Sequence, residues 1–284
     1  MKTVPDIRPS PIAGQWYPAE ASRLASQVDG YIRAAHLPEV RGRVIAAMAP
    51  HAGHRYSGPV AGYTFAALRD IQPELVAVVS PMHYPYQAPL LTTAHRAYAT
   101  PLGEIPVDDE ALQTLDALLN DNLGFGLTRV IKDPEHSLEI ELPFLQRTFT
   151  TPFKLLPIMV RDQSEPIVRA FGRCLAQVLQ GKNAFLLAST DLSHFYPQPM
   201  ANRLDSEILR RVEAFDPHAV LQAEEEGKGY ACGKGALAAV IWAAKDLGAT
   251  HAQVLHHATS GDVTGDYSQV VGYGAAIFIH REEE

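Results

Sequence analysis

Short apolar runs alternate along the chain with longer segments in which apolar residues recur at the period of a helix. The runs that predict strands are 44–49, 75–79, 153–160, 184–188, 253–256 and 270–279. The segments that predict helices are 20–35, 60–68, 108–119, 138–147, 166–179, 202–212, 217–225 and 234–247. This alternation is typical of α/β proteins, so we expect a central, mainly parallel sheet flanked by helices.

The chain has no obvious division into parts. No linker rich in glycine, serine or proline interrupts the pattern, and no internal repeat occurs, so residues 1–284 predict a single domain. Residues 81–106 are rich in proline and polar residues, which predicts a hairpin or an excursion over the sheet. Gly58 and Pro59 predict the start of the helix that follows them.

Composition excludes several classes of protein. No apolar run reaches the ~18 residues of a membrane span, and prolines and charges stand where a secretory leader would be apolar. The two cysteines, Cys174 and Cys232, are too few for a disulfide framework, so we expect free thiols and a cytoplasmic location. The net charge is −8 and the basic residues are scattered, which argues against a nucleic-acid partner.

Three histidines share one position relative to predicted strands. His51 follows "VIAAMAP", His83 follows "LVAVVSPM" and His194 follows "NAFLLASTDLS". Taken singly, each is most simply a loop histidine that caps a neighbouring element. Ligands bind at the carboxyl ends of parallel strands, however, and three histidines at that edge predict one shared site.

Two further residues belong with these histidines. Cys232 stands directly before a predicted helix, where the helix dipole lowers a thiol pKa and favours a metal ligand or a nucleophile. Cys174 lies at helical spacing among apolar residues and predicts an inert core thiol. Asp191 precedes His194 by three positions and either orients an imidazole, moves a proton, or caps a helix.

Weaker candidates surround this set. His136, in "DPEHSLEIELPFLQ", either lines the cavity or belongs to a helix-capping arrangement with Ser137 and Glu139. Arg55 and Tyr56 are expected to frame a ligand, whereas His54 is expected to face the rim. The phosphate loop G-x-x-x-x-G-K-[ST] is absent, which argues against a nucleotide site.

The segments "PHAGHRYSGPVAG", "SPMH", "EHSLEIELPFLQ", "STDLSHF", "ACGKGAL" and "GDVTGDYSQVVGYGAA" together resemble the successive blocks of the Memo family, called AmmeMemoRadiSam system protein B in bacteria and archaea. The resemblance implies an α/β fold related to the LigB-type extradiol dioxygenases, which use non-haem ferrous iron. It places metal ligands at His51, His83 and Cys232, with Asp191 and His194 in the same pocket. A cysteine stands where those dioxygenases have a glutamate, so we expect little catechol ring opening.

Two imidazoles and a thiolate suit Fe(II) or copper, with zinc as a further choice, and leave coordination positions open. We therefore expect redox chemistry on a small-molecule or peptide ligand. The resemblance also suggests radical SAM and AMMECR-type proteins as partners in a modification pathway. Two alternatives stay open: a peptide-binding scaffold with a vestigial site, and a cysteine hydrolase that uses Cys232, His194 and Asp191.

Overall fold

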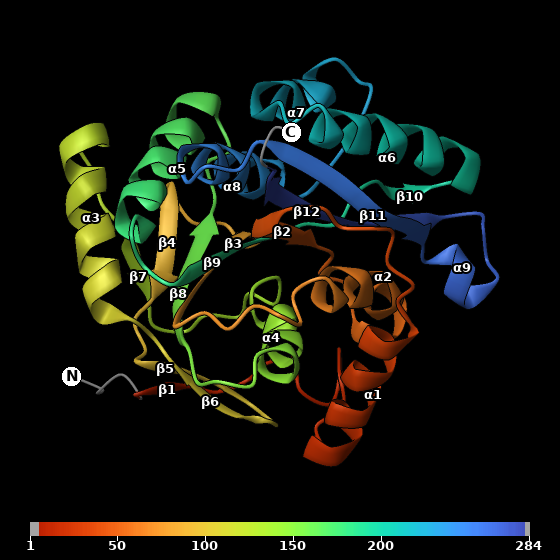
Figure 1. The fold of residues 1–284 in the computed structure, drawn as a ribbon, viewed down its shortest axis with the longest axis horizontal. Helices are drawn as coiled ribbons and strands as arrows, with labels where there is room; N and C mark the ends of the chain where they lie inside the picture. Colours follow the sequence, from red (N-terminus) through yellow and green to blue (C-terminus); the bar gives the residue numbers. More distant parts are fainter. Residues whose placement is uncertain (1–5, 282–284) are drawn as a thin grey trace.

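The computed structural model describes residues 6–281 (Figure 1). The strands are β1 (Ile7–Arg8), β2 (Arg43–Ala49), β3 (Leu75–Pro81), β4 (Leu90–Thr93), β5 (Ala97–Thr100), β6 (Gly103–Pro106), β7 (Thr128–Val130), β8 (Lys154–Val160), β9 (Ala184–Ser189), β10 (His194–Tyr196), β11 (His251–Thr259) and β12 (Val270–His280). The helices are α1 (Ala21–Ala34), α2 (His54–Ala66), α3 (Asp109–Leu123), α4 (Leu142–Thr148), α5 (Glu165–Leu179), α6 (Gln198–Glu213), α7 (Pro217–Glu225), α8 (Lys234–Asp246) and α9 (Gly261–Thr264), with a 3₁₀ helix at Glu139–Glu141.

A mixed, nine-stranded sheet runs in the order β10-β12-β2-β9-β3-β8-β4-β7, and β11 pairs with β12. The four central strands β2, β9, β3 and β8 are parallel. At one side β12 is antiparallel to β2, and at the other side β4 is antiparallel to β8. The α/β prediction is confirmed, with the parallel strands in the centre of the sheet.

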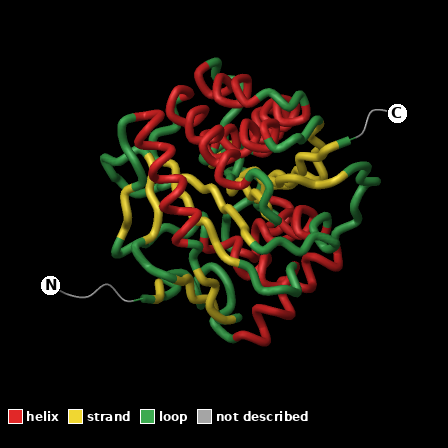
Figure 2. Tube along the Cα trace, turned by 60° about the vertical axis from the view of Figure 1, so that its left-hand side comes forward, coloured by secondary structure: helices red, strands yellow, loops and turns green. Residues whose placement is uncertain are grey.

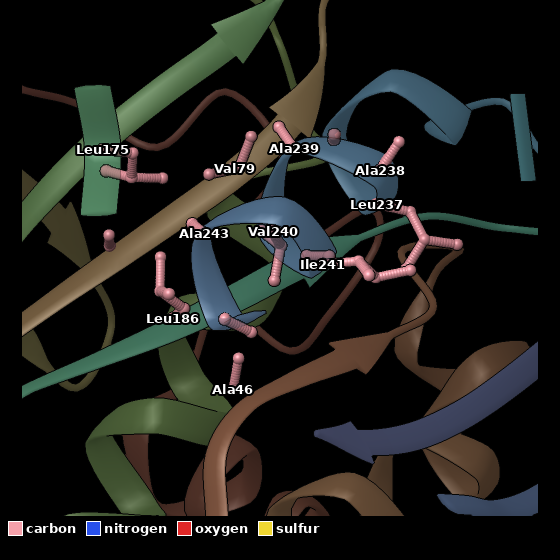
Figure 3. Close-up of a cluster of buried hydrophobic side chains, with 14 of the residues drawn as sticks. Ala46, Val79, Leu175, Leu186, Leu237, Ala238, Ala239, Val240, Ile241 and Ala243 are labelled. Carbon is pink, nitrogen blue, oxygen red and sulfur yellow. The ribbon is translucent and has the colours of Figure 1, made fainter. Parts of the chain in front are cut away.

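Both faces of the central sheet are buried by helices (Figure 1). Helices α3, α5, α6, α7 and α8 pack on one face, and α1, α2 and α4 pack on the other. Strand β2 contributes to both cores, because Ala46 and Met48 belong to the first cluster and Ala47 belongs to the second. Figure 3 shows α8 against parallel strands that carry Val79 and Leu186. Burial on both faces explains why these strands read as unbroken apolar runs.

Residues 81–106 form three short strands. β5 and β6 make the predicted hairpin, and they join β1 in a small separate sheet close to the N-terminal end of the described chain (Figure 2). The strand predicted at 253–256 is present and longer than predicted, since β11 spans His251–Thr259. Within residues 6–281, no helix combines the length and the apolar composition that crossing a bilayer requires.

The predicted start of α2 is wrong. The helix begins at His54 rather than after Gly58, and Pro59 lies inside it. A proline at this position removes a hydrogen bond to the Arg55 carbonyl. The helix nevertheless continues past Pro59 to Ala66.

Candidate metal centre

The chain turns at the carboxyl ends of three adjacent strands and delivers polar side chains to one place. β2, β9 and β3 are neighbours in the sheet and end at Ala49, Ser189 and Pro81. His51, Asp191 and His83 each follow within two residues of these ends. Side chains from the ends of three parallel strands therefore meet at one edge of the sheet.

Three imidazoles cluster at this edge. The candidate ligand atoms of His51, His83 and His136 all lie within 4.8 Å of one another. The rings of His83 and His136 stack with centroids 4.9 Å apart, and His51 meets both edge-on at 5.3 and 5.5 Å. Nitrogen donors on one tetrahedral zinc ion lie about 3.4 Å apart, so shifts of about 1 Å would bring the rings onto one ion.

The structure places His136 beside His51 and His83, and the helix-capping alternative for this segment is wrong. The 3₁₀ helix that follows has no side-chain cap. Instead the Ser137 hydroxyl donates to the Pro81 carbonyl at 2.9 Å, and Glu139 accepts a hydrogen bond from Arg8. These two bonds attach the 133–139 segment to β3 and β1, which holds His136 beside His83.

Cys232 contacts the imidazole cluster through His51. Its Sγ lies 3.2 Å from Nε2 of His51 and accepts the backbone N–H of Asp191 at 3.3 Å. The chain passes close to β9 here, since a Cβ added at Gly233 would lie 2.6 Å from the Ser189 carbonyl oxygen. The sulfur therefore sits where the sequence predicts it.

The acidity expected of Cys232 is wrong for the metal-free protein. Burial, with a contribution from the Asp191 carboxyl, raises the pKa of this thiol well above its ordinary value. Burial thus outweighs the dipole of α8, which favours the thiolate. A bound cation would offset the cost of a buried thiolate. Cys174 is a buried free thiol whose pKa burial also raises, as expected of a core cysteine.

The Glu135 carboxylate fixes the tautomer of His83. Its Oε1 lies 2.9 Å from Nδ1 of His83, and its Oε2 accepts the His83 backbone N–H at 2.6 Å. Burial raises the pKa of Glu135, but the His83 hydrogen bond and the nearby imidazoles outweigh it and hold that pKa well below its usual range. An ionised Glu135 can only accept, so Nδ1 of His83 carries the hydrogen and Nε2 keeps its lone pair.

Two rings of this cluster, those of His51 and His136, are set among groups that disfavour a positive charge on them. Burial lowers the pKa of His136 to about 4. Burial and the neighbouring imidazoles hold the pKa of His51 well below its ordinary value. Neutral imidazole is the form that binds a metal, so neither ring needs to lose a proton first at neutral pH.

Asp191 and His194 lie at the same edge but have different contacts. Oδ1 of Asp191 accepts the backbone N–H of His51 at 2.7 Å, and burial raises the pKa of this carboxyl to about 7. The helix-cap alternative for Asp191 is wrong, because α6 begins only at Gln198. Nε2 of His194 is buried and has no hydrogen-bond partner among residues 6–281.

A groove of about 530 Å³ opens beside the centre. Trp16, Tyr56, Phe195 and Tyr273 contribute aromatic walls, and the Trp16 ring lies 4.1 Å from that of His136. Tyr56 thus lines the groove as predicted. Arg55 is exposed, and its guanidinium carbon lies 5.8 Å from the Tyr56 ring.

The prediction that His54 faces the rim is wrong. His54 is only 1% exposed, and its Nε2 donates to the Ile140 carbonyl at 2.9 Å. His54 opens α2, and its ring packs edge-on against Phe144 of α4. It therefore holds two helices together, away from the solvent.

Residues that support the centre were missed in the sequence. These are Arg8, Glu135, Glu141 and Ser189. The available signal was the pair of glutamates among apolar residues in "SLEIELPF", since buried acids need partners. Arg8 supplies one set of partners: it is 1% exposed and donates to Asp133, Glu139 and the Glu135 carbonyl.

The fold and the strand-end residues define an α/β protein with a candidate metal centre at the carboxyl edge of its parallel strands. Residues 8–277 match the family model described as Memo-like protein. A MEMO1 family protein of Nitrosopumilus maritimus is 34% identical over 277 residues, covering 96% of this chain and 100% of the relative. A second one, from Methanopyrus kandleri, is 34% identical over 280 residues, covering 94% and 97%. The chain belongs to the Memo family, as the sequence blocks indicated.

A solved structure shares the fold at much lower identity. The crystal structure of the uncharacterized protein JW3007 from Escherichia coli K12 matches with a TM-score of 0.52 and 14% identity. The match covers 83% of this chain and 100% of that chain. At this identity the likeness concerns the fold alone.

Proposed function

We propose that this Memo-family protein binds iron or copper through His51, His83 and Cys232 and performs redox chemistry on a small-molecule or peptide ligand in the aromatic groove. The observation that carries the proposal is the meeting of His51, His83 and His136 within 4.8 Å, with the Cys232 sulfur 3.2 Å from His51. His136 is the adjacent donor on the groove side, where Trp16 contacts it.

The chemistry of these donors fits such an ion. Imidazole and thiolate ligands suit Fe(II), copper and zinc, whereas Mg²⁺ and Ca²⁺ prefer oxygen ligands. Nδ1 of His83 is taken by Glu135 and Nδ1 of His51 by Ser189, so both rings offer Nε2. An iron or copper ion would supply one-electron chemistry and open positions for a ligand.

The other residues of the centre have roles that follow from their contacts. Asp191 holds the turn after β2 by accepting the His51 backbone N–H. We propose that His194, whose buried Nε2 has no partner within residues 6–281, contacts the bound ligand and exchanges a proton with it. The groove walls hold the ligand beside the imidazoles.

Metal analysis of protein expressed and purified without added metal and without oxygen tests the proposal. We expect close to one iron or copper ion per chain in the wild-type protein and a large loss of it in Cys232→Ser. Cys174→Ser is the matched control, because Cys174 is a buried thiol inside α5. Full metal content in Cys232→Ser, or none in the wild-type protein, would contradict the proposal.

Removing the charge of Glu135 is expected to weaken binding at the same centre. In Glu135→Gln the His83 ring loses its ionised acceptor, so we expect about 10- to 100-fold weaker zinc binding, measured by chelator competition. Glu213→Gln, which changes an exposed residue of α6, should bind zinc as the wild-type protein does. Equal zinc affinity in Glu135→Gln and the control would contradict the role of Glu135 in orienting His83.

A cysteine hydrolase is the second candidate, and one contact favours it. The 3.2 Å approach of Cys232 Sγ to His51 Nε2 resembles a thiol–imidazole pair. The base would then be His51, not His194. The raised pKa of the buried thiol argues against a free nucleophile. Rapid alkylation of Cys232 in metal-loaded protein would favour the hydrolase, whereas protection from alkylation by the metal supports our proposal.

The cellular location and the partners of the protein are also proposals. Both cysteines are free thiols, which is usual in a reducing compartment, so we propose a cytoplasmic location. Radical SAM and AMMECR-type proteins stay predictions as partners. A peptide-binding scaffold would hold its partner equally well after removal of the metal, which distinguishes it from a metal-dependent enzyme.

A further inference from the structure

The hydroxyl of Ser189 lies within hydrogen-bond distance of three groups. Its Oγ is 3.0 Å from Nδ1 of His51, 2.6 Å from the Ser137 carbonyl oxygen and 2.9 Å from Oε1 of Glu141. Ser189 and Glu141 are 0% and 1% exposed. The hydrogens in this chain of contacts must therefore come from the groups themselves.

Counting hydrogens leaves one consistent arrangement. A serine hydroxyl has one hydrogen to donate and two lone pairs that accept. The Ser137 carbonyl can only accept, and it is the nearest group, so the hydroxyl hydrogen points to it. The other two contacts then require a hydrogen on Nδ1 of His51 and a hydrogen on Oε1 of Glu141. A carboxylate at Glu141 would instead place two oxygen lone pairs against each other.

We propose that Glu141 is a neutral carboxylic acid and a positioning residue, whose O–H donates to Ser189 and holds the Ser189 hydroxyl with its hydrogen on the Ser137 carbonyl. Ser189 in this orientation can only accept from His51, which keeps the hydrogen of His51 on Nδ1. Nε2 of His51 then always offers its lone pair toward Cys232. The neutral state of Glu141 is inferred from the hydrogen count alone. The role of these contacts in orienting a metal ligand rests on the proposed metal centre.

The surroundings of Glu141 support a neutral acid. Its Oε2 has no hydrogen-bond partner among residues 6–281, which a carbonyl oxygen tolerates better than a carboxylate oxygen. Burial raises the pKa of Glu141 well above its ordinary value, and the nearby Asp191 carboxyl raises it further. Glu139, two residues earlier, is paired with the Arg8 guanidinium. Of these two buried acids, Glu139 thus has a cation as its partner and Glu141 has a hydroxyl.

The proposal separates two substitutions of Glu141. Glutamine has the same shape, and its amide N–H donates to Ser189 as the acid O–H does, so Glu141→Gln should keep zinc affinity within about 2-fold. Glu141→Leu removes the donor, and Ser189→Ala removes the link to His51. Each should weaken zinc binding about 10-fold. If Glu141 were ionised, Glu141→Gln would remove a buried negative charge and weaken zinc binding as Glu141→Leu does.

The deciding experiment uses the metal-free protein at neutral pH. Infrared difference spectra of wild type minus Glu141→Gln should show the carbonyl band of a protonated carboxylic acid, and the Asp191→Asn variant identifies any band from that carboxyl. Nitrogen-15 NMR should show His51 protonated on Nδ1 in wild type and Glu141→Gln. Absence of the Glu141 band, or His51 protonated on Nε2, would overturn the proposal.

These readouts do not depend on the metal. A wild-type protein that binds no zinc would refute the proposed metal centre, while the infrared and NMR results would still decide the state of Glu141 and His51. If Ser189→Ala does not fold, the comparison of Glu141→Gln with Glu141→Leu and the two spectra keep the test complete.

Discussion

Replacing His51 by alanine is expected to weaken zinc binding by about 100-fold or more, because it removes one of the three proposed ligands. His51 is the residue that lies next to both the other two imidazoles and the Cys232 sulfur. Its candidate ligand nitrogen lies within 4.8 Å of those of His83 and His136, and its Nε2 lies 3.2 Å from the Cys232 sulfur. Chelator competition against a series of zinc concentrations measures the loss.

His218→Ala is the control for that experiment. His218 is an exposed histidine of α7 that pairs with Glu165, so its loss should leave zinc binding unchanged. His136→Ala is the informative comparison, and we expect a smaller loss than for His51→Ala because Cys232 completes the proposed ligand set. Unchanged affinity in His51→Ala would contradict the proposed centre, and equal losses in both variants would make His136 a full ligand.

Replacing Arg8 by methionine is expected to lower the free energy of unfolding by about 3 to 5 kcal/mol, because it leaves buried carboxylates without their cation. Arg8 is 1% exposed, its Nε donates to Asp133 at 2.7 Å, and a second nitrogen donates to Glu139. Its third contact is the Glu135 carbonyl, also at 2.7 Å. Urea denaturation followed by circular dichroism measures the change.

The control for Arg8 is an exposed ion pair of the same kind. Arg129 and Asp109 lie 3.1 Å apart with 41% and 57% of their side chains exposed, so Arg129→Met should cost less than about 1 kcal/mol. If Arg8→Met costs no more than Arg129→Met, the buried pair does not stabilise the fold. Because Arg8 also holds the segment with Glu135 and His136, Arg8→Met should weaken zinc binding even at temperatures where it stays folded.

The central strands could be predicted because their own residues show how deeply they are buried. β2, β3 and β9 are buried on both faces and therefore read as apolar runs. Short strands such as β1 and β7 have two and three residues, too few to show a period. The start of α2 was placed too late because Pro59 is usually a sign of a first turn, whereas here it lies inside the helix.

The candidate site, too, could be predicted only in part. His51, His83 and Cys232 could be predicted to converge, because strand ends and a helix start fix where they lie. Their partners could not, since the Glu135 carboxylate bonds not only to its sequence neighbour His136 but also to His83, 52 residues away. The expected acidity of Cys232 was wrong because burial, a property of the folded chain, raises the thiol pKa and outweighs the effect of the helix dipole.

X-ray absorption spectroscopy of the metal-loaded protein, prepared without oxygen, tests the central claim most directly. Two imidazole nitrogens and one sulfur should surround the ion in the wild-type protein, and the sulfur contribution should disappear in Cys232→Ser. An ion surrounded only by nitrogen and oxygen in the wild-type protein would contradict the proposed set of His51, His83 and Cys232.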